Sequence, residues 1–410
     1  MSDLVSGRPT NSADPISAGE RLIELDALRG VALFGVLVAN LVLFSISNNI
    51  STDAQQETMF AVQANRIVLF AVLWLIDDKA STLFAILFGA GFWLQISRLK
   101  AKGAGAQRVY LRRLLILLAI GIANLFLIWP WDILQQYALV GIILLAIHRL
   151  PSRWLFLLGL PLAIAGKPLI DWAFQANGAR AASDALVYSD EAVQNRQSAY
   201  LETSYQDWVN ETAILVWNDY LLSGAVLGWA AYVLGRFLLG MYLMQGGCIE
   251  RSATQPILLR RATIALLSIG WLLEATRSAI QLGFFDTSQW MGTALQAIGA
   301  PVLALGYAGV ILLLCCTPSG KTLLRPFADV GQMALTNYLT HGFFIAFLLY
   351  GHSGGLALAG RLSPCLALTC AISFFVFQAV LSRFWLTQFQ RGPVEAFWRW
   401  GTYARAFRYP

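Results

Sequence analysis

Apolar runs of about 20 residues recur along the chain, and this feature most limits how the protein can fold. Only 13% of the residues are charged, compared with about 25% in an ordinary soluble domain. In lipid, every backbone N–H and C=O group needs a partner within the protein, so runs of this length cross as helices. The sequence therefore predicts an all-α, polytopic helical membrane bundle of about ten spans. We expect the spans at about 27–46, 80–97, 111–129, 133–147, 153–172, 213–235, 262–282, 291–314, 332–350 and 364–384.

The basic residues predict the orientation of the bundle. On this count of spans, most of the 29 Lys and Arg residues fall in alternate loops and in the two terminal segments. Cytoplasmic loops are enriched in Lys and Arg, so we expect both termini in the cytoplasm. Residues 66–76 are apolar but too short to cross, and the charged residues Asp77–Lys79 follow them directly. This pattern predicts a re-entrant or interfacial helix on the outer side.

Polarity along the chain divides it into four parts. Residues 1–20 are polar and form a predicted disordered cytoplasmic tail, and residues 21–172 form an N-terminal half of five spans. Residues 173–212 mix acidic and aromatic side chains, which indicates extracytoplasmic amphipathic helices lying over the bundle. Residues 213–410 form a C-terminal half of five spans that ends in a cytoplasmic tail.

Several enzyme classes lack their residues here. The chain has three histidines and no HExxH, Walker-loop or GxSxG motif, and no Cys/His cluster, so the sequence predicts no metal site. The net charge of +6 reflects membrane topology and does not predict a nucleic-acid partner.

Charged residues at the start of two spans allow two interpretations each. Asp26 and Arg29 are three residues apart where the chain enters the membrane, and can pair on one helical face. They form either a structural lock or part of a polar site, because charges at this depth are costly to desolvate. Lys79 either pairs with Asp77 or Asp78 or neutralises an anionic ligand.

Polar residues inside apolar spans are the other candidates. His341 has Asn337 four residues earlier on the same helical face. Such a His is either a general base that the amide orients, or a residue that forms hydrogen bonds between helices for packing alone. Asp132 is either an N-cap or a carboxylate facing a cavity. Asn40 and Asn124 need hydrogen-bond partners within the bundle, and interhelical bonds are their usual role.

Five ordered blocks of this sequence resemble the YeiB family of bacterial multi-pass membrane proteins. The blocks are RLIELDALRGVALFGVLVAN at 21–40, KASTLFAILFGAGF at 79–92, WPWDILQQYALVG at 129–141, GQMALTNYL at 331–339 and WLTQFQRGPVEAFWRWGTY at 385–403. The resemblance extends to a group of transmembrane acyltransferases that includes the heparan-glucosamine acetyltransferase. It implies an enzyme of the bacterial inner membrane with a cavity open to both sides. The family-motif residues carried over are Asp26, Arg29, Lys79, Asp132, Asn337 and Tyr338.

One position departs from the family pattern, which often has a His where this chain has Asn124. An amide cannot act as a base near neutral pH. Either His341 has taken over the role of the base, or the reaction needs no protein base, or this member of the family has lost the activity.

The resemblance implies transfer of an acyl group from cytosolic acyl-CoA, most simply acetyl-CoA, to an extracytoplasmic or lipid-linked hydroxyl or amine, such as a glycan. The expected roles are a base at His341 with Asn337 and Asp132, and a polar cavity that Asp26, Arg29, Asn40, Lys79, Asn124 and Tyr338 line. The basic residues that could hold coenzyme phosphates are Arg112, Arg113 and Arg325. A transporter or exporter of a small amphiphile needs the same cavity without a base and remains the alternative. The wider group also makes a homodimer possible.

Overall fold

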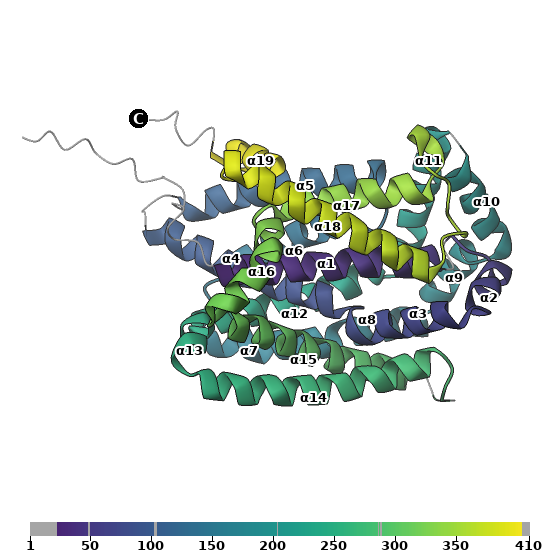
Figure 1. Ribbon diagram of the computed structural model, residues 1–410. Helices are drawn as coiled ribbons and strands as arrows, with labels where there is room; N and C mark the ends of the chain where they lie inside the picture. Colours follow the sequence, from purple (N-terminus) through teal and green to yellow (C-terminus); the bar gives the residue numbers. More distant parts are fainter. Residues whose placement is uncertain are drawn as a thin grey trace, which may run out of the picture.

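The computed structural model describes residues 23–47, 50–101, 105–202, 204–285, 287 and 289–403, and the predicted tail at 1–20 lies outside them. Every regular element within these residues is helical (Figure 1). The α-helices are α1 (Ile23–Ser45), α2 (Asp53–Phe60), α3 (Gln63–Leu75), α4 (Lys79–Ala101), α5 (Ala106–Leu127), α6 (Leu134–Ile147), α7 (Ser152–Pro161), α8 (Lys167–Ala176), α9 (Ala179–Val187), α10 (Asp190–Leu201), α11 (Tyr205–Leu215), α12 (Ala225–Gln245), α13 (Cys248–Thr254), α14 (Pro256–Gln281), α15 (Gln289–Cys315), α16 (Pro318–Gln332), α17 (Ala334–Leu349), α18 (Pro364–Gln388) and α19 (Pro393–Tyr403). The π-helical segments η2 (Leu162–Gly166) and η3 (Val216–Leu222) and the 3-10 turn η4 (His352–Gly354) complete the set.

The all-helical membrane fold predicted from the sequence is confirmed. Among the described residues, 7 helical segments are long and apolar enough to cross a membrane, or up to 8 if the bent pair around residues 53–101 counts as one span. Nine of the ten predicted spans correspond to a helical segment, but the span predicted at 213–235 crosses the turn at residues 223–224, and the membrane-length helix there is α12 (Ala225–Gln245). In addition, α6 and α17 have only 14 and 16 residues. A helix needs about 20 residues to cross, so the count of ten exceeds the number of helices that meet this length.

The segment predicted as re-entrant or interfacial is α3. It leads into α4 in the same direction across a short break at residues 76–78, while α2 joins this unit at an angle of 101° (Figure 1). The chain therefore does not turn back after α3. The physical reason is that the charged side chains of Asp77–Lys79 form salt bridges within the bundle, as described below, and so do not have to be exposed to water.

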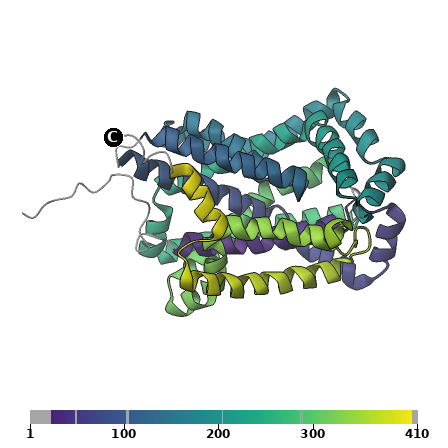
Figure 2. The same ribbon diagram turned by 90° about the horizontal axis from the view of Figure 1, so that it is seen from above.

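The long helices run side by side and leave two distinct ends (Figures 1 and 2). One end, the α19 end, contains the start of α1, α13 and α19; the other, the α10 end, contains α2, α9, α10 and α11. Helix α1 lies in the centre and packs against α4, α16 and α18, so helices from both halves of the chain share one bundle.

Two glycines set the crossing of α1 with α16. A Cβ atom at Gly30 would lie 1.8 Å from the carbonyl oxygen of Phe327, and one at Gly331 would lie 1.9 Å from the carbonyl oxygen of Asp26. The two backbones therefore touch, which is how membrane helices commonly associate. This contact places Arg29, one residue before Gly30, beside the N-terminal part of α17.

The outer surface of the bundle is apolar. On α14, Ile257, Leu258 and Leu272 are 71%, 62% and 70% exposed. Exposed apolar residues along a membrane-length helix are suited to lipid contact rather than to water.

Candidate functional site

A buried charge network surrounds the break between α3 and α4. Lys79 donates hydrogen bonds to the carboxylate of Glu274 and, over 2.7 Å, to the carbonyl oxygen of Leu73. The Nε atom of Arg277 donates to the same Glu274 carboxylate over 3.0 Å, and its Nη2 atom lies 3.1 Å from Asp77. Lys79 is 1% exposed and Glu274 is fully buried. The partner of Lys79 is thus an acid on α14, while Asp77 pairs with Arg277.

The third charge of the break, Asp78, pairs with Arg236 of α12. The two guanidinium nitrogens lie 3.2 Å from the two carboxylate oxygens, a two-pronged contact with geometric specificity. The Tyr232 hydroxyl also donates to Asp78, and the Arg236 guanidinium lies 2.9 Å from the Tyr232 ring centroid. Three acids and three bases around the break therefore offset one another, which allows them to remain charged inside the bundle.

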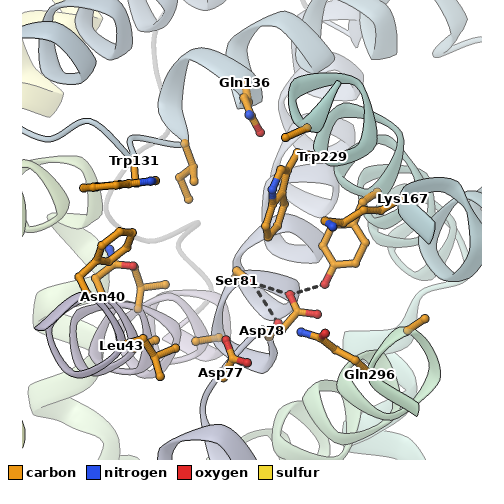
Figure 3. A pocket seen from close by; sticks show the side chains of 18 of the residues that line it. Asn40, Leu43, Asp77, Asp78, Ser81, Trp131, Gln136, Lys167, Trp229 and Gln296 are labelled. Atoms are coloured by element: carbon orange, nitrogen blue, oxygen red, sulfur yellow. Dashed lines mark hydrogen bonds between the residues drawn. The ribbon is translucent and has the colours of Figure 1, made fainter. Parts of the chain in front are cut away.

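A cavity of about 420 Å³ lies toward the α10 end, and we call it the tryptophan cavity after Trp131 and Trp229 in its lining (Figure 3). Trp131 comes from the turn before α6 and Trp229 from α12, and the two rings stand on opposite sides of the space. The amide side chains that point into it are Asn40, Gln136 and Gln296. Its volume is in the range of small-molecule sites, roughly 300–1,000 Å³.

A second cavity, of about 200 Å³, lies toward the α19 end, and we call it the arginine cavity after Arg29 and Arg113 in its lining. Arg29 donates a 2.8 Å hydrogen bond to Asp26, so this pair forms as the sequence allowed. The Arg113 guanidinium lies 3.6 Å from the ring centroid of Trp398 on α19, and the Trp398 indole N–H donates to the Arg113 carbonyl over 2.8 Å. Helix α19 thereby forms part of the cavity wall.

Tyr338 of α17 lines both cavities. Its hydroxyl donates a 2.9 Å hydrogen bond to Asp132, which also accepts from the amide of Asn124 over 2.8 Å and from the Leu134 N–H over 2.9 Å. Asp132 is fully buried in the turn between α5 and α6 and lines neither cavity, so Tyr338 is the side chain that connects it to both. Burial raises the pKa of the Asp132 carboxyl to about 7, although its hydrogen bonds favour the charged form. A carboxyl with this pKa can accept or release a proton near neutral pH.

His341 lines neither of these cavities. Its Nε2 atom lies 2.8 Å from the Oε1 atom of Gln378 on α18, and Gln378 donates to Thr340 and to the Asn337 carbonyl. The Asn337 side chain donates to Ser382 of α18 and to the carbonyl of Val330. These contacts form an interhelical network between α17 and α18.

Of the three arginines predicted to hold phosphates, Arg113 lines the arginine cavity, and Arg112 and Arg325 line neither cavity. Asn40 lines the tryptophan cavity and Asn124 lies behind Tyr338. In the part of the chain that the structure describes, no three His, Cys, Asp or Glu side chains are placed to share a metal ion.

Sequence reasoning missed most of the tryptophan cavity. Trp131 and Gln136 lie in the WPWDILQQYALVG block and could have been found there, but Trp229, Gln296 and Asp219 gave no signal because each comes from a different helix.

The fold and the two cavities define a polytopic helical membrane protein with a polar interior. Residues 224–405 match a family model described as "Protein of unknown function (DUF418)". The chain is 30% identical to the "Uncharacterized protein YeiB" of Escherichia coli (strain K12), over 93% of this chain and 96% of that protein. It is 28% identical to the "Uncharacterized protein YxaH" of Bacillus subtilis (strain 168), over 96% and 97% respectively. The chain belongs to the YeiB family.

Proposed function

We propose that this protein is a membrane acyltransferase of the bacterial inner membrane, which moves an acyl group from a cytosolic acyl-CoA to a hydroxyl or amine acceptor. The observation that carries the proposal is that one side chain, Tyr338, lines both cavities and donates a hydrogen bond to the buried carboxyl of Asp132. A donor in one cavity and an acceptor in the other would meet at this hydroxyl. Such positioning is worth several orders of magnitude in rate.

The proposed topology places the α19 end, with both termini, in the cytoplasm. Helix α4 finishes at this end with Arg98 and Lys100 in its last turn, and α5 starts there with Arg108, Arg112 and Arg113. An excess of basic residues marks the cytoplasmic side of membrane proteins. The arginine cavity would then face the cytoplasm and the tryptophan cavity the outside.

The donor would lie in the arginine cavity. A cavity of about 200 Å³ has room only for the acyl end of the donor, and acetyl-CoA has a small acyl group, while the nucleotide would lie outside the cavity. Arg113 and Arg29 supply cationic groups for phosphates of the coenzyme. Phe84, Phe88 and Leu117 form an apolar wall for the acyl group and the thioester.

In the reaction, the acceptor O–H or N–H gives its proton to the Tyr338 oxygen while Tyr338 passes its own proton to the Asp132 carboxylate. The acceptor oxygen or nitrogen bonds to the thioester carbonyl carbon, and the C–S bond breaks. The proton then returns through Tyr338 to the coenzyme A thiolate, which leaves as the thiol. The products are the acylated acceptor and coenzyme A, and Asp132 ends ionised as it began.

The second candidate is a transporter for a small amphiphile. It is favoured by the position of the two cavities toward opposite ends of the bundle with a single shared side chain, an arrangement that movement of Tyr338 could open. The two functions differ in whether acyl-CoA is consumed.

The test is acyl transfer by purified protein in lipid vesicles, with radiolabelled acetyl-CoA and a panel of hydroxyl and amine acceptors. Tyr338→Phe and Asp132→Asn should each lower the rate by about 10²–10⁴-fold, the usual contribution of acid–base catalysis. The matched control is Tyr307→Phe, which also removes a tyrosine hydroxyl, here half-buried and bonded to the Leu75 carbonyl over 3.0 Å, and it should leave the rate unchanged. If an acceptor crosses the vesicle membrane while no acetyl-CoA is consumed, the result would support the transporter instead.

A further inference from the structure

The tryptophan cavity has aromatic walls on several sides. Trp131, Trp229, Phe44 and Tyr220 line it, and they come from the turn before α6, from α12, from α1 and from η3. The faces of aromatic rings carry partial negative charge and attract cations. The faces of these rings therefore suit an apolar ligand surface or a cationic group rather than an anion.

The charged groups in the lining are mostly acidic. Asp77, Asp78 and Asp219 line the cavity, while Arg277 and Arg236, which pair with the first two, are absent from the lining. The guanidinium groups thus lie behind the carboxylates, as seen from inside the cavity.

Two further charged residues line the cavity, Lys167 and Asp219, and only Lys167 forms a salt bridge among the described residues. Lys167 pairs with Asp171, one turn further along α8, and its ammonium group also lies 5.7 Å from the ring centroid of Trp229. The Asp219 carboxylate accepts a 3.2 Å hydrogen bond from the Tyr188 hydroxyl, and no Lys or Arg of the described residues forms a salt bridge with it. The lining therefore holds one carboxylate that makes no salt bridge among the described residues, although the charges of Arg180 and Arg196 act on it at longer range.

Three amides in the lining are also open to a ligand. The side chains of Asn40, Gln136 and Gln296 make no hydrogen bond to any residue that the structure describes, and Gln136 is only 5% exposed. They come from α1, α6 and α15 and point into the same space (Figure 3). A buried amide without a partner is costly, so a ligand that accepts and donates hydrogen bonds would satisfy all three.

We propose that the tryptophan cavity recognises a small acceptor that carries an ammonium group, with Asp219 as its counter-ion, Trp131 and Trp229 as its aromatic walls, and the three amides as partners for its hydroxyl groups. The inference rests on the proposed function, in which this cavity holds the acceptor. A carboxylate that makes no salt bridge and the faces of aromatic rings in one cavity attract the same kind of group, a desolvated organic cation. The group that receives the acyl chain is the one that reaches Tyr338.

The test is equilibrium binding to the purified full chain in detergent, by isothermal titration calorimetry and without any acyl-CoA. Two matched pairs of probes serve. Choline is compared with its uncharged carbon isostere dimethylbutanol, and glucosamine with glucose. We expect each cationic probe to bind at least about tenfold more tightly than its neutral partner. Asp219→Asn, which keeps the shape and removes the charge, should abolish this preference. The control is Asp207→Asn on the exposed face of α11, outside the cavity, which should preserve it.

Equal binding of glucose and glucosamine would overturn the proposal in favour of a neutral saccharide, and so would the absence of binding by both cationic probes. Retention of the full cationic preference in Asp219→Asn would overturn the assignment of Asp219. The comparison within the wild-type protein does not depend on any variant folding. Because no acyl-CoA is present, a failure of acyl transfer would leave this result standing and would instead favour a transporter for organic cations.

Discussion

The buried pair of Lys79 and Glu274 gives a prediction whose size follows from the structure. Lys79→Met leaves the Glu274 carboxylate fully buried with Arg277 as its remaining cationic partner. Removing one member of a buried pair costs about 3–5 kcal/mol, a large share of the roughly 5–15 kcal/mol that stabilises a typical protein. Because Arg277 remains, we expect the lower end, about 3 kcal/mol. The assay is thermal unfolding of the purified protein in detergent, in which this loss should lower Tm by on the order of 5 °C.

The matched control is Lys167→Met, which breaks another Lys–Asp/Glu pair but one whose two side chains are each 32% exposed. Exposed pairs contribute about 0–1 kcal/mol, so Tm should move little. The double variant Lys79→Met with Glu274→Met should recover much of the loss, because Arg277 keeps Asp77 and no charge remains alone. If Lys79→Met melts as Lys167→Met does, or if the double variant loses the sum of both single effects, the charge network does not stabilise the bundle as we describe.

Three further predictions concern other parts of the bundle. Gly30→Ala places a methyl group 1.8 Å from the carbonyl oxygen of Phe327, so α1 and α16 must separate; we expect a loss of about 1–3 kcal/mol in a thermal melt, and an unchanged Tm would show that the helices do not touch there. Glu395→Ala removes the carboxylate that accepts from the N–H and hydroxyl groups of Thr336 at the start of α17; loss of such a cap costs on the order of 1 kcal/mol, which the same melt would detect. His341→Gln should change the acyl-transfer rate by less than about threefold, since His341 lines neither cavity; a fall of about 10²–10⁴-fold would make it the base.

The sequence predicted the helical framework because a chain that crosses lipid must pair its backbone N–H and C=O groups internally, which an α-helix does within a single segment. Apolar length is a property of one segment at a time, and it located a helix for every predicted span except 213–235, which crosses the turn before α12. The apolar runs also predicted spans at α6 and α17, although helices of 14 and 16 residues are shorter than the roughly 20 residues that a crossing needs. They also predicted a re-entrant or interfacial helix at 66–76, because that run is too short to cross by itself; in the structure it is α3, which leads into α4.

The site was harder to predict because its contacts join distant segments. The Lys79–Glu274 pair is 195 residues apart, and the Tyr338–Asp132 hydrogen bond spans 206. Tyr338 and His341 are three residues apart on α17, yet one faces the cavities and the other faces α18. The rarity of histidine drew attention to His341, whereas only the packing of α17 reveals which side chain borders the cavities.

The measurement that tests the central claim most directly is the pH dependence of acyl transfer in the wild-type protein and in Asp132→Asn. Burial raises the pKa of Asp132 to about 7, and only its ionised form can accept the proton from Tyr338. The rate should therefore rise as pH increases through about 7 and then level off, and this rise should be absent from the residual rate of Asp132→Asn. A rise that persists unchanged in Asp132→Asn, or one that disappears in His341→Gln, would contradict the proposed relay at the wall between the two cavities.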